Sequence, residues 1–231
     1  MLTCSSWTAA LHLAIQSIGI KKNDTVIIPI INFSAFSNIL FLQGKAKVHF
    51  ADVDPQTGQV TPQTITQCIK KNNIKKVNAI FTMYLSGSPN NIVQFYRLKK
   101  RLNCLLIEDA CHALGASYKF NKNKYRVGSA KHADISTFSF HPVKSITTGE
   151  GGAISFNKKS IYQFSKILRS HGIIRKNKKY WDYNIKVPGL NYRLSDINCS
   201  LGLSQLNRLK EFIKKRRYLV SLYKKYLGDI K

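Results

Sequence analysis

The stretch IVQFYRLKKRLNCLLIEDACH, residues 92–112, contains the unit from which the fold is built. Residues 92–102 predict a helix, and residues 104–107 then form a short apolar run that is typical of a buried strand. Acidic and imidazole groups follow where that strand ends, in the segment Glu108–His112. A helix that leads into a buried strand with polar groups at its end is typical of a parallel α/β sheet.

The same alternation fills the sequence before this unit. Helices are predicted where apolar residues recur at helical spacing, and strands where short runs are β-branched and apolar. Helices are predicted at 8–18, 35–43 and 62–71, and Gly19 ends the first of them. Strands are predicted at 25–28, 47–50 and 77–81. Together they predict an α/β fold with a mostly parallel sheet and helices on both faces. Ligands of such sheets bind outside the carboxyl ends of the strands, so a site is expected beside residues 108–112.

A second segment is predicted to reach that same edge of the sheet. Two short strands, 135–140 and 152–156, bracket the sequence HPVKSITTGEG at 141–151, which contains Lys144. A lysine in a mostly apolar pocket can lose its proton, because desolvation disfavours the ammonium, and the neutral amine can condense with an aldehyde. On spacing alone, a surface lysine whose stem lies on apolar neighbours is the favoured alternative.

Two further positions have a structural and a functional interpretation. Asp109 ends an apolar strand, where it either caps the next turn or pairs with a cation such as a protonated pyridine nitrogen. Thr8 and Ala9 open the first helix, so their N–H groups and the Thr8 hydroxyl can bind an anion. Ordinary capping of that helix by Ser6 is the alternative. The amine, the carboxylate and the anion site together fit one cofactor.

The composition indicates a folded globule. With 231 residues and 44% apolar content the chain can bury a core. Its apolar runs are far shorter than the ~20 residues of a membrane helix, and its start lacks the features of a secretion signal, so we expect a cytoplasmic protein. The five cysteines are scattered without a C-x-x-C pair, which argues against a disulfide framework and against a metal site.

The net charge of +26 requires an explanation. Lysine and arginine fall in short clusters along the whole chain, for example at 99–101, 175–179 and 214–217. Such an excess is common in proteins that bind nucleic acid or another polyanion. It also arises, together with abundant Asn and Ile, from an AT-rich coding sequence. The sequence contains no helix-turn-helix, zinc finger or aromatic-basic stripe, which makes nucleic acid the less favoured partner.

Several strings in this sequence resemble those of the DegT/DnrJ/EryC1/StrS sugar aminotransferases. The string SFHPVKSITTGEGG at 139–152 closely resembles the cofactor-lysine signature of that family. Further matching strings stand in the family's order at 8–14, 29–34, 52–55, 108–115, 169–172 and 189–196. The resemblance implies the large domain of a pyridoxal-phosphate-dependent transferase of fold type I, and pyridoxal 5'-phosphate as the cofactor.

The resemblance also implies roles for the residues around the cofactor ring. Lys144 binds the cofactor covalently and later moves a proton between the two carbons of the transamination. Asp109 keeps the pyridine nitrogen protonated. His112 stands where many members carry Gln and hydrogen-bonds the ring 3-oxygen, and Phe33 lies against the ring face.

The phosphate of the cofactor is implied to have its own set of ligands. Thr8, Ala9 and Ser139 bind it from within the chain. Asn191 reaches the phosphate of a neighbouring subunit, so the resemblance implies a homodimer.

The implied reaction is an exchange in two stages. An amino acid, expected to be glutamate, leaves its amino group on the cofactor, and a keto sugar then takes it. His112 and the string 201–206 are similar to members that act in pseudaminic acid biosynthesis, which implies amination at C4 of a UDP-4-keto-6-deoxy-N-acetylhexosamine. The alternatives are an inactive remnant and a polyanion-binding module on the same scaffold.

Two features depart from the family pattern. Trp7 stands where members usually carry a small residue, directly before the phosphate-binding Thr8, so crowding of that loop is expected. Members are also longer at both ends. We expect a large domain over residues 1–200 and, over 201–231, a helix that leads into a small C-terminal domain that is largely absent.

Overall fold

The computed structural model of the chain describes residues 1–44, 46–175 and 181–228. The α-helices are α1 (Trp7–Ser17), α2 (Ala35–Leu42), α3 (Pro62–Lys71), α4 (Ile92–Leu102), α5 (Lys159–Leu168), α6 (Asp196–Asn207) and α7 (Leu209–Leu227). The strands are β1 (Leu2–Cys4), β2 (Thr25–Pro29), β3 (Lys47–Ala51), β4 (Ala79–Met83), β5 (Leu105–Asp109), β6 (Ser117–Phe120), β7 (Asn123–Arg126), β8 (Ile135–Ser139), β9 (Gly152–Phe156), β10 (Ile173–Arg175) and β11 (Tyr183–Ile185).

Seven of the strands form one mostly parallel sheet, in the order β1-β9-β8-β5-β4-β2-β3. Strands β3, β2, β4, β5 and β8 are parallel, and β9 runs antiparallel to both of its neighbours, β8 and β1. The remaining strands pair in two short hairpins, β6–β7 and β10–β11. The prediction of a mostly parallel α/β sheet is confirmed.

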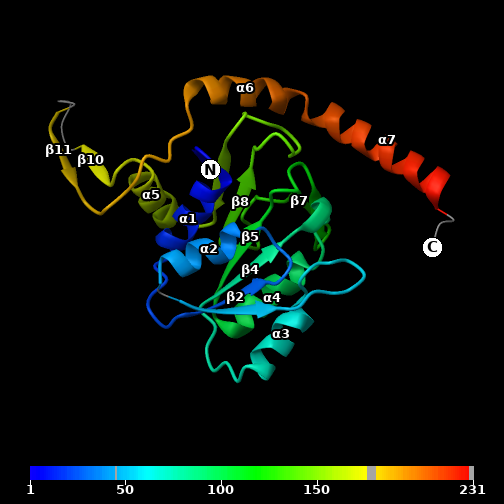
Figure 1. Cartoon of the computed structure of the whole chain (residues 1–231), viewed down its shortest axis with the longest axis horizontal. Coiled ribbons are helices and arrows are strands. Elements are labelled where there is room, and N and C mark those ends of the chain that lie inside the picture. The colour runs from blue at the N-terminus through cyan, green and yellow to red at the C-terminus, as the bar shows by residue number, and fades with distance from the viewer. Residues whose placement is uncertain (45, 176–180, 229–231) are drawn as a thin grey trace.

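Both faces of this sheet are buried under helices. Helices α1, α2 and α5 cover one face, and α3 and α4 cover the other (Figure 1). The side chains of β2 alternate between the two layers: Val26 and Ile28 pack in the core under α1, whereas Ile27 packs in the core under α3 and α4. A central strand that is buried on both sides reads as a continuous apolar run, which is why TVIIP could be identified in the sequence.

The helix ends agree with the local sequence. The Ser6 hydroxyl accepts a hydrogen bond from the N–H of Ala9 at 3.0 Å and caps α1. Thr61 and Thr64 form a reciprocal capping box at the start of α3, with Pro62 as its first residue. Gly19, with φ of +67°, follows the last turn of α1 in the left-handed conformation that favours glycine.

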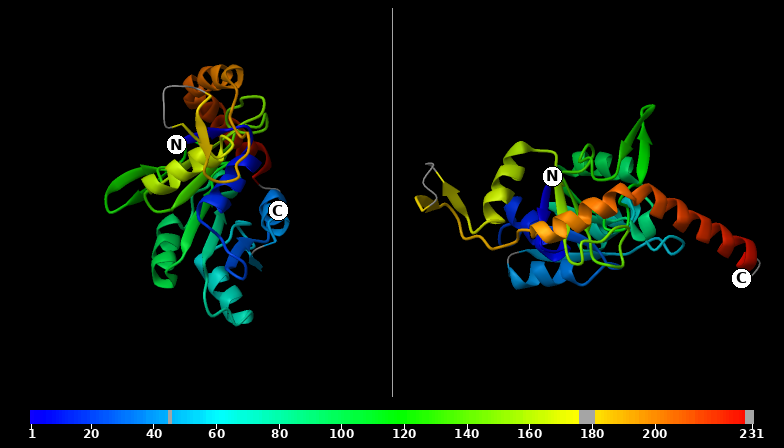
Figure 2. Two further views of the ribbon diagram at one scale, coloured as in Figure 1. Left: turned by 90° about the vertical axis from the view of Figure 1, so that its left-hand side faces the viewer. Right: turned by 90° about the horizontal axis from the view of Figure 1, so that it is seen from above.

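The C-terminal part of the described chain differs from the prediction. Within the described residues, the single helix expected over 201–231 is divided between two helices, α6 and α7, which Arg208 separates with φ of −94° and ψ of 0°. Residue 200, where the large domain is expected to end, lies inside α6, and the domain boundary stays a prediction. Both helices run across the carboxyl edge of the sheet, and α7 extends past the body of the molecule (Figures 1 and 2).

Two expectations from the sequence can be compared only with the described residues. Of the basic cluster at 175–179, only Arg175 belongs to the described residues. Within the described part of the chain, no helix has the length and apolar character needed to cross a bilayer.

Candidate active site

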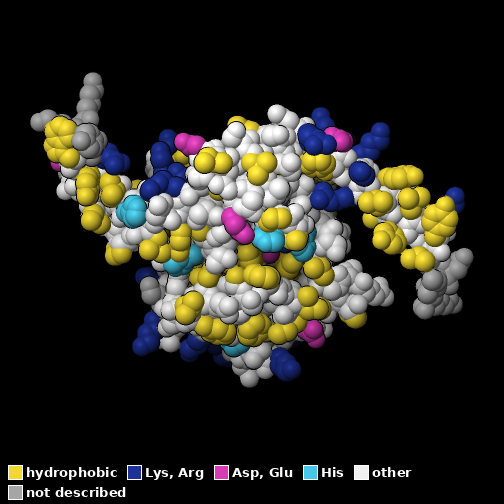
Figure 3. Space-filling view, turned by 45° about the horizontal axis from the view of Figure 1, so that its top comes forward, with side chains coloured by type: hydrophobic (Ala, Val, Ile, Leu, Met, Phe, Trp, Pro, Cys, Tyr) yellow, Lys and Arg dark blue, Asp and Glu magenta, His cyan; other side chains and the backbone are white. Residues whose placement is uncertain are grey.

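A cavity of about 500 Å³ opens at the carboxyl edge of β4, β5 and β8. In Figure 3, imidazole and acidic side chains gather with apolar ones near the centre of the face shown. The cavity lies where the sequence predicted a site, beyond the carboxyl ends of parallel strands. Its lining residues are Ser6, Trp7, Thr8, Ile31, Asn32, Phe33, Met83, Leu85, Asp109, Cys111, His112, Ser139, His141, Val143, Lys144 and Glu150.

Lys144 and His112 meet in this cavity from two different loops. Nζ of Lys144 lies 2.9 Å from Nε2 of His112. The other ring nitrogen, Nδ1, accepts a hydrogen bond from the N–H of Ser86 at 3.3 Å. Burial, and secondarily the charge of Lys144, lowers the pKa of His112. A neutral ring that accepts at Nδ1 carries its proton on Nε2, the ring nitrogen that faces the Lys144 side chain.

Asp109 provides a buried carboxylate in the wall of the cavity. It is the last residue of β5, is 2% exposed, and accepts the N–H of Cys111 at Oδ1 at 2.9 Å. Burial raises the pKa of Asp109, while hydrogen bonds from Cys111 and the charge of Lys144 act in the opposite direction. A carboxylate that is buried to this extent is stabilised by any cation that enters the cavity.

Glu108 does not belong to the cavity, although it precedes Asp109. Successive side chains of a strand point to opposite faces of the sheet, and Glu108 therefore points away from Lys144. Its Oε1 accepts the hydroxyl proton of Tyr84, and its Oε2 accepts that of Ser136 at 2.7 Å. These contacts join residues of β5 and β8 to the residue that follows β4. Glu108 thus holds together the strand ends that carry the site.

Trp7 lies in the cavity wall with its ring buried. Its Nε1–H donates to Oγ1 of Thr137 on β8 at 3.1 Å, and its ring packs edge-to-face against Phe33 and Phe36. Its backbone lies against β9, where a Cβ on Gly152 would come within 2.6 Å of the Ser6 carbonyl oxygen. Glycine at position 152 therefore allows the start of α1 to approach the sheet edge.

The predicted phosphate ligands occupy two different environments. Thr8 is exposed in the first turn of α1 and lines the cavity, as does the buried Ser139 at the end of β8. Ala9 is buried and does not line the cavity, and its N–H is bound by the Ser6 hydroxyl. Thr8 and Ser139 thus present hydroxyls to the cavity beside the N-terminus of a helix, which favours an anion.

Phe33 and Asn191 were both predicted to contact a cofactor, Asn191 that of a neighbouring subunit. Phe33 lies in the cavity wall, and Asn191 lies outside it. Phe33 lines the cavity and is 64% exposed. Asn191 is exposed and lies outside the cavity lining, with its Oδ1 accepting the N–H of Arg193 at 3.4 Å. The reach of Asn191 into a second subunit stays a prediction.

A second imidazole and a carboxylate lie at the rim of the cavity. Nε2 of His141 is 3.9 Å from Oε1 of Glu150, and Nδ1 of His141 accepts the N–H of Val143 at 3.4 Å. Both side chains are about half exposed or more. Among the described residues, no three His, Cys, Asp or Glu side chains come together as a metal site.

The comparisons with known proteins agree with this geometry. The chain matches the sequence model of the DegT/DnrJ/EryC1/StrS aminotransferase family over residues 1–231. It is 41% identical over 221 residues to the UDP-4-amino-4,6-dideoxy-N-acetyl-beta-L-altrosamine transaminase of Campylobacter jejuni subsp. jejuni serotype O:23/36 (strain 81-176), covering 96% of this chain and 56% of that protein. It is 36% identical over 228 residues to the GDP-perosamine synthase of Escherichia coli O157:H7, covering 99% and 58%.

Solved structures of aminotransferases superpose on this fold. Helicobacter pylori PseC, an aminotransferase involved in the biosynthesis of pseudoaminic acid, superposes with a TM-score of 0.87 at 30% identity, over 99% of this chain and 58% of that one. The putative sugar aminotransferase Spr1654 from Streptococcus pneumoniae in its PLP-form superposes with a TM-score of 0.85 at 27% identity, over 99% and 60%. The chain spans little more than half the length of the relatives that it matches.

Proposed function

Since the chain belongs to the DegT/DnrJ/EryC1/StrS aminotransferase family, we propose that it binds pyridoxal 5'-phosphate in this cavity and transfers an amino group to a nucleotide sugar. The observation that carries the proposal is the position of the Lys144 amine, 2.9 Å from His112 in a cavity that the buried carboxylate of Asp109 also lines. An amine and a buried anion at one strand edge suit a ligand that combines an aldehyde with a cationic ring.

The residues of the cavity fit this cofactor group by group. Asp109 offers a negative charge for the protonated ring nitrogen, and its burial strengthens that pairing. Thr8 and Ser139 offer hydroxyls for the phosphate, beside the first turn of α1. The exposed ring of Phe33 offers an apolar surface for the flat ring.

Each side chain then has a task of its own. When bound, pyridoxal phosphate supplies an electron sink that lets a proton leave the carbon bearing the amino group. Lys144 holds the aldehyde carbon and moves that proton. Asp109 keeps the ring nitrogen positively charged. The Nε2–H of His112 donates to the ring 3-oxygen, because the Ser86 N–H keeps Nδ1 as the acceptor.

The proposed substrates follow from the relatives. The sugar is a UDP-4-keto-6-deoxy-N-acetylhexosamine that is aminated at C4, and glutamate is the proposed donor. The support is the printed activity of the Campylobacter jejuni relative. We also propose a homodimer in which Asn191 reaches the phosphate bound by the second copy. Its exposed position, outside the cavity of its own chain, is compatible with such a role.

The test is the visible absorbance of the purified chain after addition of pyridoxal phosphate and dialysis. Wild type should keep a visible band that Lys144→Ala lacks, because the amine holds the cofactor. Lys158→Ala is the matched control, since Lys158 is an exposed lysine at the start of α5. A band that persists in Lys144→Ala, or the absence of a band in wild type, would contradict the proposal for this chain.

The substrate proposal needs a second measurement. Wild type that retains the visible band should lose it on addition of glutamate and regain it on addition of the UDP-linked keto sugar. A GDP-linked keto sugar serves as the comparison, because one relative is a GDP-perosamine synthase. Recovery of the band with the GDP-linked sugar alone would overturn the proposed substrate while the proposed cofactor stands.

A further inference from the structure

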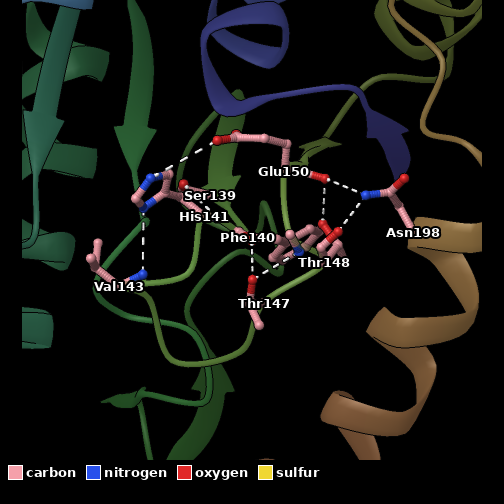
Figure 4. A network of polar contacts seen from close by, with 9 residues as sticks. Ser139, Phe140, His141, Val143, Thr147, Thr148, Glu150 and Asn198 are labelled. Atoms are coloured by element: carbon pink, nitrogen blue, oxygen red, sulfur yellow. Dashed lines mark hydrogen bonds and ion pairs between the residues drawn. The ribbon is translucent and has the colours of Figure 1, made fainter.

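The loop that carries Lys144 is bound by a side chain from α6 (Figure 4). Nδ2 of Asn198 donates to the carbonyl oxygens of Thr148 and Glu150, the latter at 3.3 Å. The other end of the amide is also fixed, because its Oδ1 accepts the hydroxyl proton of Ser195. Asn198 therefore has one orientation, in which its amide donors face the lysine loop.

Close packing accompanies these hydrogen bonds. A Cβ on Gly202, one helical turn after Asn198, would come within 2.7 Å of Cγ2 of Thr148. A Cβ on Gly151 would come within 2.1 Å of Oγ1 of Thr148 and 3.1 Å of Leu194. Helix α6 thus lies directly on the loop, and Gly202 provides the space for that contact.

Helix α7 binds the same loop at the lysine itself. Arg216 donates from Nη2 to the carbonyl oxygen of Lys144 at 3.1 Å and from Nη1 to that of Ser145 at 3.2 Å. The same helix also packs on the segment that follows His112. A Cβ on Gly115 would come within 2.6 Å of Ile213 and 3.5 Å of Leu209. Helix α7 therefore contacts both of the loops whose side chains meet in the cavity.

We propose that Asn198 and Arg216 are positioning residues that hold the Lys144 loop against the His112 segment. The proposal rests on the cofactor role of Lys144 given above. Residues 140–151 contain no helix or strand, and the carbonyls of Lys144, Ser145 and Thr148 accept their hydrogen bonds from side chains of α6 and α7. A small displacement of a reacting group has a large effect on reactivity, and a firm supporting contact limits that displacement.

The test compares Asn198→Asp, Arg216→Met and the control Arg217→Met. Asn198→Asp keeps the shape of the side chain but turns an oxygen toward two carbonyl oxygens. Arg216→Met keeps the stem and removes the donors. Arg217 is an exposed neighbour on the same helix, and its side chain makes no hydrogen bond to the described residues. Arg217→Met thus controls for the loss of one positive charge.

The first measurement is hydrogen exchange in the cofactor-free protein. The amides of Lys144, Thr148 and Gly149 are bonded within the loop, to His141, Phe140 and Thr147 respectively. Their exchange should be on the order of tenfold faster in Asn198→Asp and Arg216→Met, and unchanged in Arg217→Met. Wild-type exchange rates in both variants, with unchanged thermal midpoints, would overturn the proposal. This readout does not depend on the cofactor.

The second measurement is visible circular dichroism at saturating pyridoxal phosphate. The signal per bound cofactor reports how Lys144 holds the ring, and a purely structural role of the two residues would leave it unchanged. It should fall at least about twofold in both variants, while Arg217→Met retains the wild-type signal. A full signal in both variants would overturn the positioning role. Failure of wild type to bind the cofactor would instead count against the proposed function.

Discussion

Nε2 of His112 lies 2.9 Å from Nζ of Lys144, and the Ser86 N–H bound at Nδ1 determines which nitrogen of the neutral ring carries the proton. The imidazole and the amine are therefore in hydrogen-bond contact. Burial opposes a charge on the ring, and a protonated ring would face a second cation. His112 is accordingly held neutral in the folded chain, which links its titration to stability and to cofactor binding.

His112→Gln should weaken the dependence of stability on pH. The pKa of His112 is lowered below its ordinary value of 6.5, so the unfolded chain takes up the proton first as the pH falls. The stability of the neutral ring is present above pH 6.5 and is lost between that value and the folded-state pKa. Gln does not titrate, so the midpoint of thermal unfolding should fall less between about pH 7.5 and pH 5.

His12→Gln is the matched comparison for this prediction. Burial also lowers the pKa of His12, which bonds Tyr192 at 2.8 Å outside the cavity. Both variants should flatten the pH profile of stability, and only His112→Gln should flatten the pH profile of pyridoxal phosphate binding. If the thermal midpoint of His112→Gln depended on pH as steeply as that of wild type, the lowered pKa of His112 would be contradicted.

Asp109→Asn should separate stability from function. The substitution removes a buried negative charge and retains an Oδ1 that accepts the Cys111 N–H, so the cofactor-free protein should melt at the same temperature or higher. Amino transfer should fall on the order of 100-fold, because the ring nitrogen loses its counterion. Calorimetry and a single-turnover assay measure the two effects. A large loss of stability without loss of activity would contradict this assignment.

Trp7→Phe should cost about 1 kcal/mol of unfolding free energy, because the variant cannot donate to Thr137. Trp7→Ala should cost about 3–5 kcal/mol, since it also leaves a cavity beneath Phe33 and Phe36. Urea denaturation of the cofactor-free protein measures both. Thr137→Val completes a double-mutant cycle, and a coupling of zero would show that the hydrogen bond contributes nothing.

Lys99→Met should be strongly destabilising although it lies far from the cavity. Nζ of Lys99 is 2.5 Å from Oδ2 of Asp134, whose side chain is 4% exposed and also accepts the N–H of Leu106. Loss of the cation leaves a buried charge unpaired, which costs about 3 kcal/mol. Lys100→Met, the adjacent position on α4, should cost well under ~1 kcal/mol. Equal denaturation midpoints for Lys99→Met and Lys100→Met would contradict this prediction.

The strands of the central sheet and the helices that cover it were predicted well from the sequence. The β6–β7 hairpin and the break between α6 and α7 were not. The buried strands and α1 to α4 have strong apolar patterns, and each is present within a few residues of its predicted bounds. The β6–β7 hairpin was missed because its turn uses Asn121 and Lys122, with φ of 46° and 65°, in place of an Asn-Gly pair. The break at Arg208 was missed because the sequence has neither Gly nor Pro there.

The candidate site was predictable where strand ends determine it. Asp109, His112 and Lys144 follow buried strands, and all three line the cavity. Asn198 and Arg216 were not identified, because a side chain that binds backbone carbonyls leaves no pattern of matching residue types. The role of Asn191 depends on a second subunit and stays a prediction.

The buried indole of Trp7 gives this site a built-in optical reporter. The chain has two tryptophans, and the other, Trp181, is 64% exposed and lies outside the cavity lining. Emission from Trp7 should be blue-shifted because its ring is dry, and a chromophore in the cavity should quench it by energy transfer. With Trp181→Phe as the background, fluorescence would then report occupancy of the cavity without any added label.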